Sequence, residues 1–282
     1  MRTIVITGGT DGIGRGLALR YLRGGERVVA LGSDPAKGAR LLQEAGRLGA
    51  GERAEFVRAD LGSVARSRAV AAEIAGRHPA VDALVLGAYR YNPVRIRTGE
   101  GFEQTFALYV LSRHLLAEGL LGSLERAAGT PVILSLCGVG GIRAGAMRWD
   151  DLQHERVPYR ATRVTMQGAR ANDLLGVSFA ERHAEGRTRY VLYNPGFVAT
   201  GMTQSLRQPM RALTRAAAAV FARSVDRAVP PVAALLDAPP AAPLSGFFQG
   251  RPVDLDRPGF DPGSAARLHA ALSSMLGESG RG

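Results

Sequence analysis

The stretch that decides the fold runs from Arg2 to Gly14 and reads RTIVITGGTDGIG. Residues 2–7 are largely apolar and β-branched, which predicts a buried parallel strand. Glycines follow at once, and apolar residues then recur with helical spacing from Ile13 to Leu22. A strand, a glycine turn and a helix in this order suit a bound pyrophosphate, because glycine lets the backbone approach the anion and the helix N-terminus attracts negative charge.

Strands and helices continue to alternate along the chain. Further strands are expected at residues 27–31, 56–59, 82–86, 132–136 and 188–193, and helices after Asp34 and Ser63 and over 103–126 and 164–182. This alternation predicts right-handed crossovers and a parallel sheet with helices on both faces. We therefore expect one α/β domain of the Rossmann type over residues 1–282. Its doubly wound sheet should have strand order 3-2-1-4-5-6 and bind ligand where the order reverses.

The last third of the chain has a different pattern. An Arg- and Ala-rich helix is expected at residues 209–223, and prolines interrupt the sequence after it. We interpret residues 202–243 as a substrate lid with a following helix. Residues 244–282 are expected to form a short seventh strand near Phe247 and a terminal helix.

The spacing Thr-Gly-x-x-x-Gly-x-Gly from Thr7 to Gly14 resembles the fingerprint of short-chain dehydrogenases/reductases. Asp60-Leu61 and the segment Asn194–Thr200 (NPGFVAT) resemble two further motifs of that family, and residues 98–116 and 149–152 are similar to its retinol-dehydrogenase branch. The resemblance implies a dinucleotide cofactor. It would contact Thr7, Gly8, Thr10, Asp11, Gly12, Ile13, Gly14, Ser33, Lys37, Asp60, Leu61, Gly87, Ala88, Pro195, Gly196, Val198 and Thr200.

NADP is favoured over NAD by the end of the second strand. An acidic residue at this point would bind the ribose hydroxyls of NAD and repel a 2′-phosphate, but Gly32 occupies the position. Ser33 and Lys37 could reach a phosphate. Asp34 remains open to another interpretation, because a helix cap requires an aspartate there just as much.

The family's catalytic motif, Tyr-x-x-x-Lys, cannot occur in this chain. Lys37 is the single lysine, and the residue four places before it is Ser33. Counting from the flanking motifs puts Thr165 and Ala169 where the resemblance implies tyrosine and lysine. The same counting puts Tyr109 in place of the family's asparagine.

Three side chains remain as candidates for catalysis. Tyr109 and Arg113 are four residues apart and share one face of a helix, so the guanidinium is expected to lower the pKa of the phenol. Tyr89 closes the fourth strand at the ligand-binding edge. Tyr109 could equally be a bulky residue that fills a vacated site.

Composition limits the other partners. The net charge of +11 comes from 35 arginines and one lysine spread along the chain, so we do not expect nucleic acid binding. No apolar run is long enough to span a membrane, and one cysteine, Cys137, fits a reducing cytoplasm. No metal-ligand spacing occurs. The resemblance implies a homodimer or homotetramer.

Three functions are compatible with the sequence. The first is an atypical NADP-dependent oxidoreductase that acts on a small organic carbonyl, alcohol or activated double bond with a non-standard proton donor. The second is a non-redox enzyme on the same fold, such as a cyclase, isomerase or dehydratase. The third is a catalytically silent cofactor-binding protein.

Overall fold

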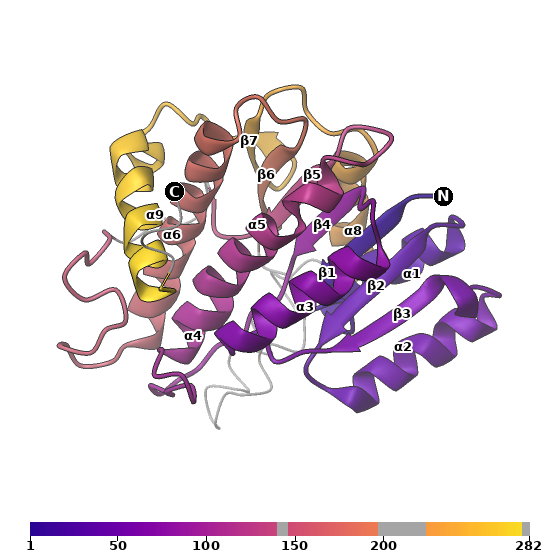
Figure 1. Ribbon diagram of the computed structural model, residues 1–282, viewed down its shortest axis with the longest axis horizontal. Helices are drawn as coiled ribbons and strands as arrows, with labels where there is room; N and C mark the ends of the chain where they lie inside the picture. The colour runs from indigo at the N-terminus through magenta and orange to yellow at the C-terminus, as the bar shows by residue number, and fades with distance from the viewer. Residues whose placement is uncertain (140–145, 197–223, 278–282) are drawn as a thin grey trace.

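The computed structural model of the chain describes residues 1–139, 146–196 and 224–277. Its centre is one sheet of eight strands in the order β3-β2-β1-β4-β5-β6-β7-β8 (Figure 1). The strands are β1 (Thr3–Thr7), β2 (Arg27–Gly32), β3 (Ala54–Arg58), β4 (Ala83–Leu86), β5 (Val132–Leu136), β6 (Arg189–Asn194), β7 (Leu244–Phe248) and β8 (Arg251–Pro252). The first seven pair in parallel, as the sequence predicted, and the order reverses between β1 and β4.

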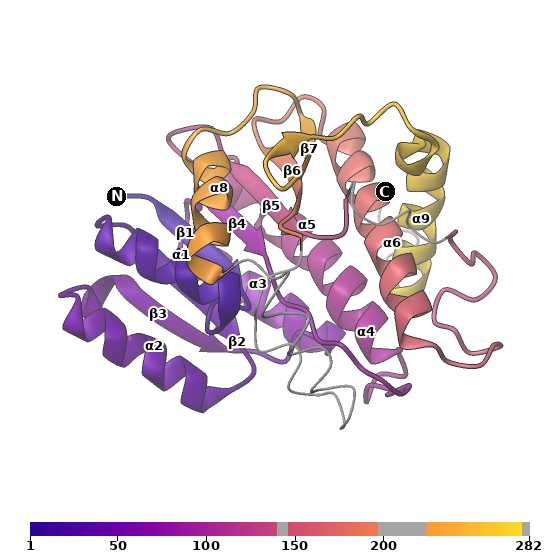
Figure 2. The ribbon, with the colours of Figure 1, turned by 180° about the vertical axis from the view of Figure 1, so that it is seen from behind.

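Helices cover both faces of the sheet (Figures 1 and 2). One face carries α1 (Gly12–Arg23), α2 (Pro35–Arg47) and α8 (Val225–Asp237), and the other carries α3 (Val64–Arg77), α5 (Ser112–Leu124) and α6 (Ala161–Arg182). Short 3₁₀ turns lie at η1 (Gly51–Arg53) and η4 (Pro258–Phe260). The five central strands β2, β1, β4, β5 and β6 are buried over most of their length, which explains their continuous apolar runs.

The predicted long helix over residues 103–126 is present but not uniform. It begins with α4 (Gln104–Phe106), widens into a π-helical turn, η2 (Ala107–Leu111), and continues as α5. A π turn leaves a carbonyl without its usual helical partner, and such turns are frequent at functional sites. Here the side-chain amide of Asn172 donates to the Tyr109 carbonyl at 2.9 Å and so anchors the π turn to α6.

The C-terminal third agrees with the sequence in part. The expected seventh strand is β7, and a two-residue antiparallel strand, β8, follows it, which the sequence did not indicate. The expected helix over residues 209–223 and most of the expected lid lie outside the described residues. The helix after it, α8, packs against α1 on the back of the sheet, and α9 (Pro262–Met275) packs against α6 (Figure 2).

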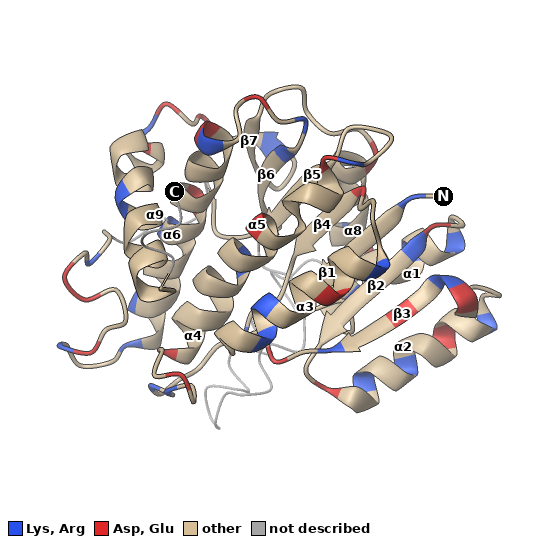
Figure 3. Cartoon of the chain, viewed as in Figure 1, with Lys and Arg blue, Asp and Glu red and all other residues tan. Residues whose placement is uncertain are grey.

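Many of the surface arginines lie beside acidic residues (Figure 3). Arg77 pairs with Glu73 and Glu55, and Arg182 pairs with Glu118. Within the described residues, no helix has both the length and the hydropathy needed to cross a membrane.

Candidate active site

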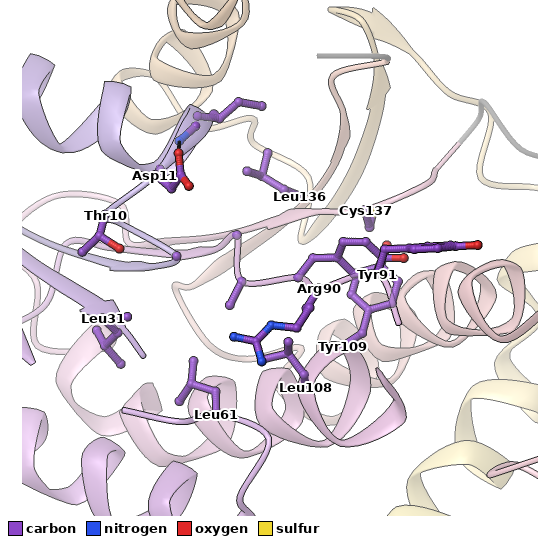
Figure 4. Close-up of a pocket in the computed structure, with 18 of the residues that line it drawn as sticks. Thr10, Asp11, Leu31, Leu61, Arg90, Tyr91, Leu108, Tyr109, Leu136 and Cys137 are labelled. Atoms are coloured by element: carbon purple, nitrogen blue, oxygen red, sulfur yellow. Dashed lines mark hydrogen bonds between the residues drawn. The ribbon is translucent and has the colours of Figure 1, made fainter. Parts of the chain in front are cut away.

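A cleft of about 840 Å³ opens at the carboxyl ends of the strands, next to the point where the strand order reverses. Figure 4 shows its two ends. Thr10, Leu31 and Leu61 lie at one end, Tyr109 and Cys137 lie at the other, and Arg90 reaches in between them. Open α/β sheets bind their ligands at this position, because the loops after adjacent strands diverge there.

The glycine turn after β1 forms a cradle that side chains would fill. Gly8 and Gly12 have positive φ angles of 69° and 48°, and a Cβ atom on Gly14 would collide with the Gly8 carbonyl. Asp11 caps α1 by accepting a hydrogen bond from the Gly12 amide at 2.8 Å. The backbone is therefore open to an anion at the N-terminus of α1, and the residues present fit a dinucleotide pyrophosphate.

The end of β2 is built around the missing side chain of Gly32. A Cβ atom there would lie 2.8 Å from Oγ1 of Thr10. Asp34 caps α2 by accepting from the amides of Ala36 and Lys37, which fits the helix-cap interpretation of this residue. The Lys37 ammonium pairs with Asp11 across the cleft.

The residues expected to contact the cofactor divide into three groups. Gly8, Thr10, Asp11, Gly12, Ile13, Gly14, Ser33, Lys37, Asp60, Leu61, Gly87, Ala88, Pro195 and Gly196 all line the cleft. Thr7 does not. Its hydroxyl accepts from the amides of Gly87 and Ala88 at 2.9 and 3.0 Å and so fixes the end of β4. Val198 and Thr200 lie outside the described residues.

Two tyrosines meet at the other end of the cleft. Tyr89, after β4, places its hydroxyl 2.8 Å from Oγ1 of Thr165 on α6. Its ring packs edge-on against Tyr109, with the centroids 4.9 Å apart. Thr165 and Ala169 also line the cleft. The tyrosine from β4 thus lies beside the position where the sequence count expected the tyrosine of the helix.

The buried guanidinium of Arg113 packs against Tyr109 of this tyrosine pair. Arg113 is 1% exposed, and its guanidinium carbon lies 4.5 Å from the centre of the Tyr109 ring. The group donates to Ser135 Oγ at 2.6 Å, to Asn172 Oδ1 at 3.0 Å and to the Ala88 carbonyl at 3.4 Å. These acceptors are all neutral, so no carboxylate among them pairs with the buried guanidinium.

Arg113 lowers the pKa of Tyr109 as expected, but burial outweighs this effect and the net pKa is raised. Burial raises the pKa of Tyr109, and the guanidinium offsets only part of that rise, because a phenolate loses its hydration in the interior. Burial also raises the pKa of Tyr89, although the hydrogen bond from Thr165 opposes it. The pKa of the Cys137 thiol is raised to about 12, which keeps it protonated and a poor nucleophile.

The model of the "short chain dehydrogenase" family matches residues 2–211. A protein of Streptomyces sp. strain C5 with the provisional name daunorubicin C-13 ketoreductase DnrU is 31% identical over 99% of this chain and 94% of its own length.

The chain belongs to the short-chain dehydrogenase family.

Human retinol dehydrogenase 14 is 28% identical over 74% of the chain and 65% of its own length, in line with the expected similarity to the retinol-dehydrogenase branch. A crystal structure of a protein from Mycobacterium paratuberculosis superposes with a TM-score of 0.74 at 21% identity, covering 98% of this chain and 94% of that one. A short-chain dehydrogenase from Burkholderia cenocepacia in complex with NADP has a TM-score of 0.66 at 18% identity, with coverage of 89% and 96%. Short-chain dehydrogenases are NAD(P)-dependent oxidoreductases.

Sequence reasoning missed the contact between Tyr89 and Thr165. The count along the chain placed Thr165 at the centre of the expected site, but nothing in the sequence indicated which side chain fills the space beside it. It also gave no role to Asn172, whose amide holds both the π turn and Arg113.

Proposed function

We propose that this short-chain dehydrogenase reduces an organic carbonyl compound with NADPH and that Tyr89 donates the proton. The hydrogen bond between Tyr89 Oη and Thr165 Oγ1 carries the proposal, because it brings a phenol to the site where the family's helix tyrosine is expected. Tyr109, the other tyrosine candidate, is only 6% exposed and is better suited to packing.

A bound NADPH would supply the hydride that adds to the carbonyl carbon. The glycine cradle would hold its pyrophosphate, and Pro195 and Gly196 also line the cleft. Tyr89 donates its proton to the carbonyl oxygen, so that the C=O double bond becomes an alcohol and the tyrosine a phenolate. Thr165 orients the Tyr89 hydroxyl and stabilises the phenolate until a proton returns from solvent.

Arg113 is the positive charge behind this step. Its guanidinium stacks on Tyr109, which in turn contacts Tyr89, so a fixed cation lies two side-chain contacts from the developing phenolate in a medium of low dielectric constant. Because its hydrogen-bond partners are neutral, no carboxylate among them cancels its field. Arg113 thus takes over the electrostatic part of the lysine's role, although it acts from α5 rather than α6.

The substrate is proposed to be an aromatic ketone or aldehyde. The cleft is lined in part by the aromatic or apolar side chains Tyr89, Tyr91, Tyr109, Leu108, Leu136 and Phe248. Flat aromatic molecules pack well against tyrosine rings. The name of the Streptomyces relative, a daunorubicin C-13 ketoreductase, supports a ketone as the substrate.

The test is a panel of aromatic and aliphatic ketones and aldehydes, with NADPH consumption followed by absorbance. Aromatic substrates should be turned over, and Tyr89→Phe should lower the single-turnover rate ~10²- to 10⁴-fold, as expected for loss of a general acid. Tyr109→Phe is the matched control, since it removes the neighbouring hydroxyl and should leave the rate within a few-fold. NADPH binding should be unchanged in both variants.

Two results would contradict the proposal. If Tyr109→Phe loses the rate and Tyr89→Phe keeps it, Tyr109 is the acid. If NADPH binds but no carbonyl compound oxidises it, a non-redox enzyme or a silent cofactor-binding protein becomes the better interpretation.

A further inference from the structure

Arg90 reaches across the cleft to the end near Ser33, where the adenosine part of a dinucleotide would lie. The residue follows β4, yet its Nη2 atom lies 3.4 Å from the hydroxyl of Ser33, which follows β2. Figure 4 shows the guanidinium lying in the cleft near Leu61 and Leu108. The loops after two strands that are not neighbours in the sheet are thus connected by one cationic side chain.

The other charged side chains at this end already have partners within the chain. Of the described residues that line the cleft, Lys37 and Arg90 are the cations and Asp11, Asp34 and Asp60 the carboxylates. The ammonium of Lys37 pairs with Asp11, and the Asp34 carboxylate accepts from the first amides of α2. Asp60 accepts from the Gly62 amide. Arg90, by contrast, hydrogen-bonds a neutral hydroxyl and keeps its charge available to a ligand.

The groups beside Ser33 suit a phosphate. Gly32 carries no side chain, and a Cβ atom there would lie 2.8 Å from Thr10 Oγ1, so close packing keeps a carboxylate out of this position at the edge of the cleft. A guanidinium binds a phosphate through two parallel hydrogen bonds and remains charged at every physiological pH. A serine hydroxyl supplies a further donor.

We propose that Arg90, together with Ser33, binds the 2′-phosphate of NADP and is the residue that selects NADP over NAD. The sequence analysis assigned this role to Ser33 and Lys37. Because Lys37 is paired with Asp11, we assign the main charged contact with the phosphate to Arg90 instead. The inference rests on the proposed function only in requiring that a dinucleotide binds, and it does not depend on any catalytic step.

The experiment measures the Kd of NADPH and NADH for the full chain and for Arg90→Met by calorimetry. Charge-assisted hydrogen bonds of this kind are typically worth a factor of about 10 to 100 in affinity. NADPH should therefore bind Arg90→Met about 10- to 100-fold more weakly, while the Kd of NADH should change less than about 3-fold. The fragments 2′,5′-ADP and 5′-AMP should repeat this difference, because they carry only the adenosine end.

Two controls separate the local contact from other effects. Arg40→Met removes the same charge from the exposed side of α2, outside the residues lining the cleft, and should leave both affinities unchanged. Lys37→Met should weaken NADPH less than Arg90→Met does, since its charge is shared with Asp11. Melting curves should show all three variants folded, and Arg90→Gln replaces Arg90→Met if the latter does not fold.

Other outcomes overturn the inference. Equal losses for NADPH and NADH would mean that Arg90 contacts the adenine or a ribose common to both. Tighter binding of both would mean that Arg90 obstructs the cleft. If the unaltered chain binds neither dinucleotide, the proposed function fails as well, whereas dinucleotide binding with an unaffected Arg90→Met overturns the role of Arg90 alone.

Discussion

Tyr109 and Gly168 fit against each other so closely that a methyl group on Gly168 would lie 2.6 Å from Cδ1 of the Tyr109 ring. Gly168 lies in the interior of α6, where glycine costs about 1 kcal/mol relative to alanine. The tyrosine ring in the π turn therefore explains a residue that helix propensity disfavours.

This fit predicts a specific pattern of stabilities. Gly168→Ala should destabilise the protein by ~1–3 kcal/mol through overpacking, and Tyr109→Ala by ~3–5 kcal/mol through a cavity. In the double variant the new methyl group enters the new cavity, so its loss should be clearly smaller than the sum of the two. Urea unfolding of the four proteins measures this, and additive losses would show that the two residues are not coupled.

The pH dependence of carbonyl reduction should follow the protonated form of Tyr89. Burial raises the pKa of its phenol above the usual value of about 10, so the proton donor stays protonated through the neutral range. The single-turnover rate should be level from neutral pH to about 10 and fall only above it. Thr165→Val removes the hydrogen bond that favours the phenolate, so it should move this fall to still higher pH. A rate that declines between pH 6 and 8 would exclude Tyr89 as the acid.

Asp173 should make the protein less stable as the pH rises. Burial raises the pKa of its carboxyl to about 7, despite the Arg170 guanidinium 3.3 Å away. The folded state then holds this proton more tightly than the unfolded state, whose aspartate ionises near 4. The free energy of unfolding should fall between about pH 4 and pH 7 and be level above that range.

Asp173→Asn should remove this loss. The variant should match the unaltered protein near pH 4 and exceed it at pH 8 by up to ~4 kcal/mol, at about 1.36 kcal/mol per pKa unit. Thermal unfolding at both pH values tests this. A variant that is equally or less stable at pH 8 would show that Asp173 is ionised and well paired in the folded protein.

Introducing the family's Tyr-x-x-x-Lys motif should not increase the rate of aldehyde reduction. In Thr165→Tyr/Ala169→Lys the new tyrosine would compete with Tyr89 for the space beside the cleft, because the Tyr89 hydroxyl already lies 2.8 Å from the Thr165 side chain. The double variant should reduce generic aldehydes no faster than the unaltered protein. The same two changes with Tyr89→Ala are the informative comparison, since they leave room for the new ring. Fast turnover by the double variant alone would indicate a conventional pocket.

The chain should be a monomer in solution. The resemblance to the family implied a homodimer or homotetramer that associates through the long helices over residues 103–126 and 164–182. In this chain α9 packs against the second of these, α6, and its His269 ring lies 5.6 Å from His114 of α5. Leu268 and Leu272 of α9 are fully buried in this contact. Light scattering should give the mass of one chain, 29.8 kDa. A mass of two or four chains would show that another surface is used or that α9 moves away.

The sequence by itself determined the framework of the molecule. The apolar runs indicated the parallel strands, because strands buried on both faces carry mostly apolar side chains, and their alternation with helices indicated the usual order of a Rossmann-type sheet. The glycine turn after the first strand indicated where a dinucleotide would bind. Gly8, Gly12 and Gly14 meet backbone angles or close approaches that no other residue allows, so the pattern is visible in the letters alone. A count of lysines was enough to exclude the usual catalytic pair.

Only the tertiary structure decided which side chains meet in the space that this pair would occupy. Tyr89 and Thr165 are 76 residues apart, and their contact depends on the distance between β4 and α6. No local sequence pattern predicts that distance. The i, i+4 spacing correctly brought Tyr109 and Arg113 together, but it could not show that both would be buried. Burial outweighed the expected lowering of the phenol's pKa by Arg113, because the cost of desolvating an ion is set by the surroundings in space and not by the neighbours in sequence.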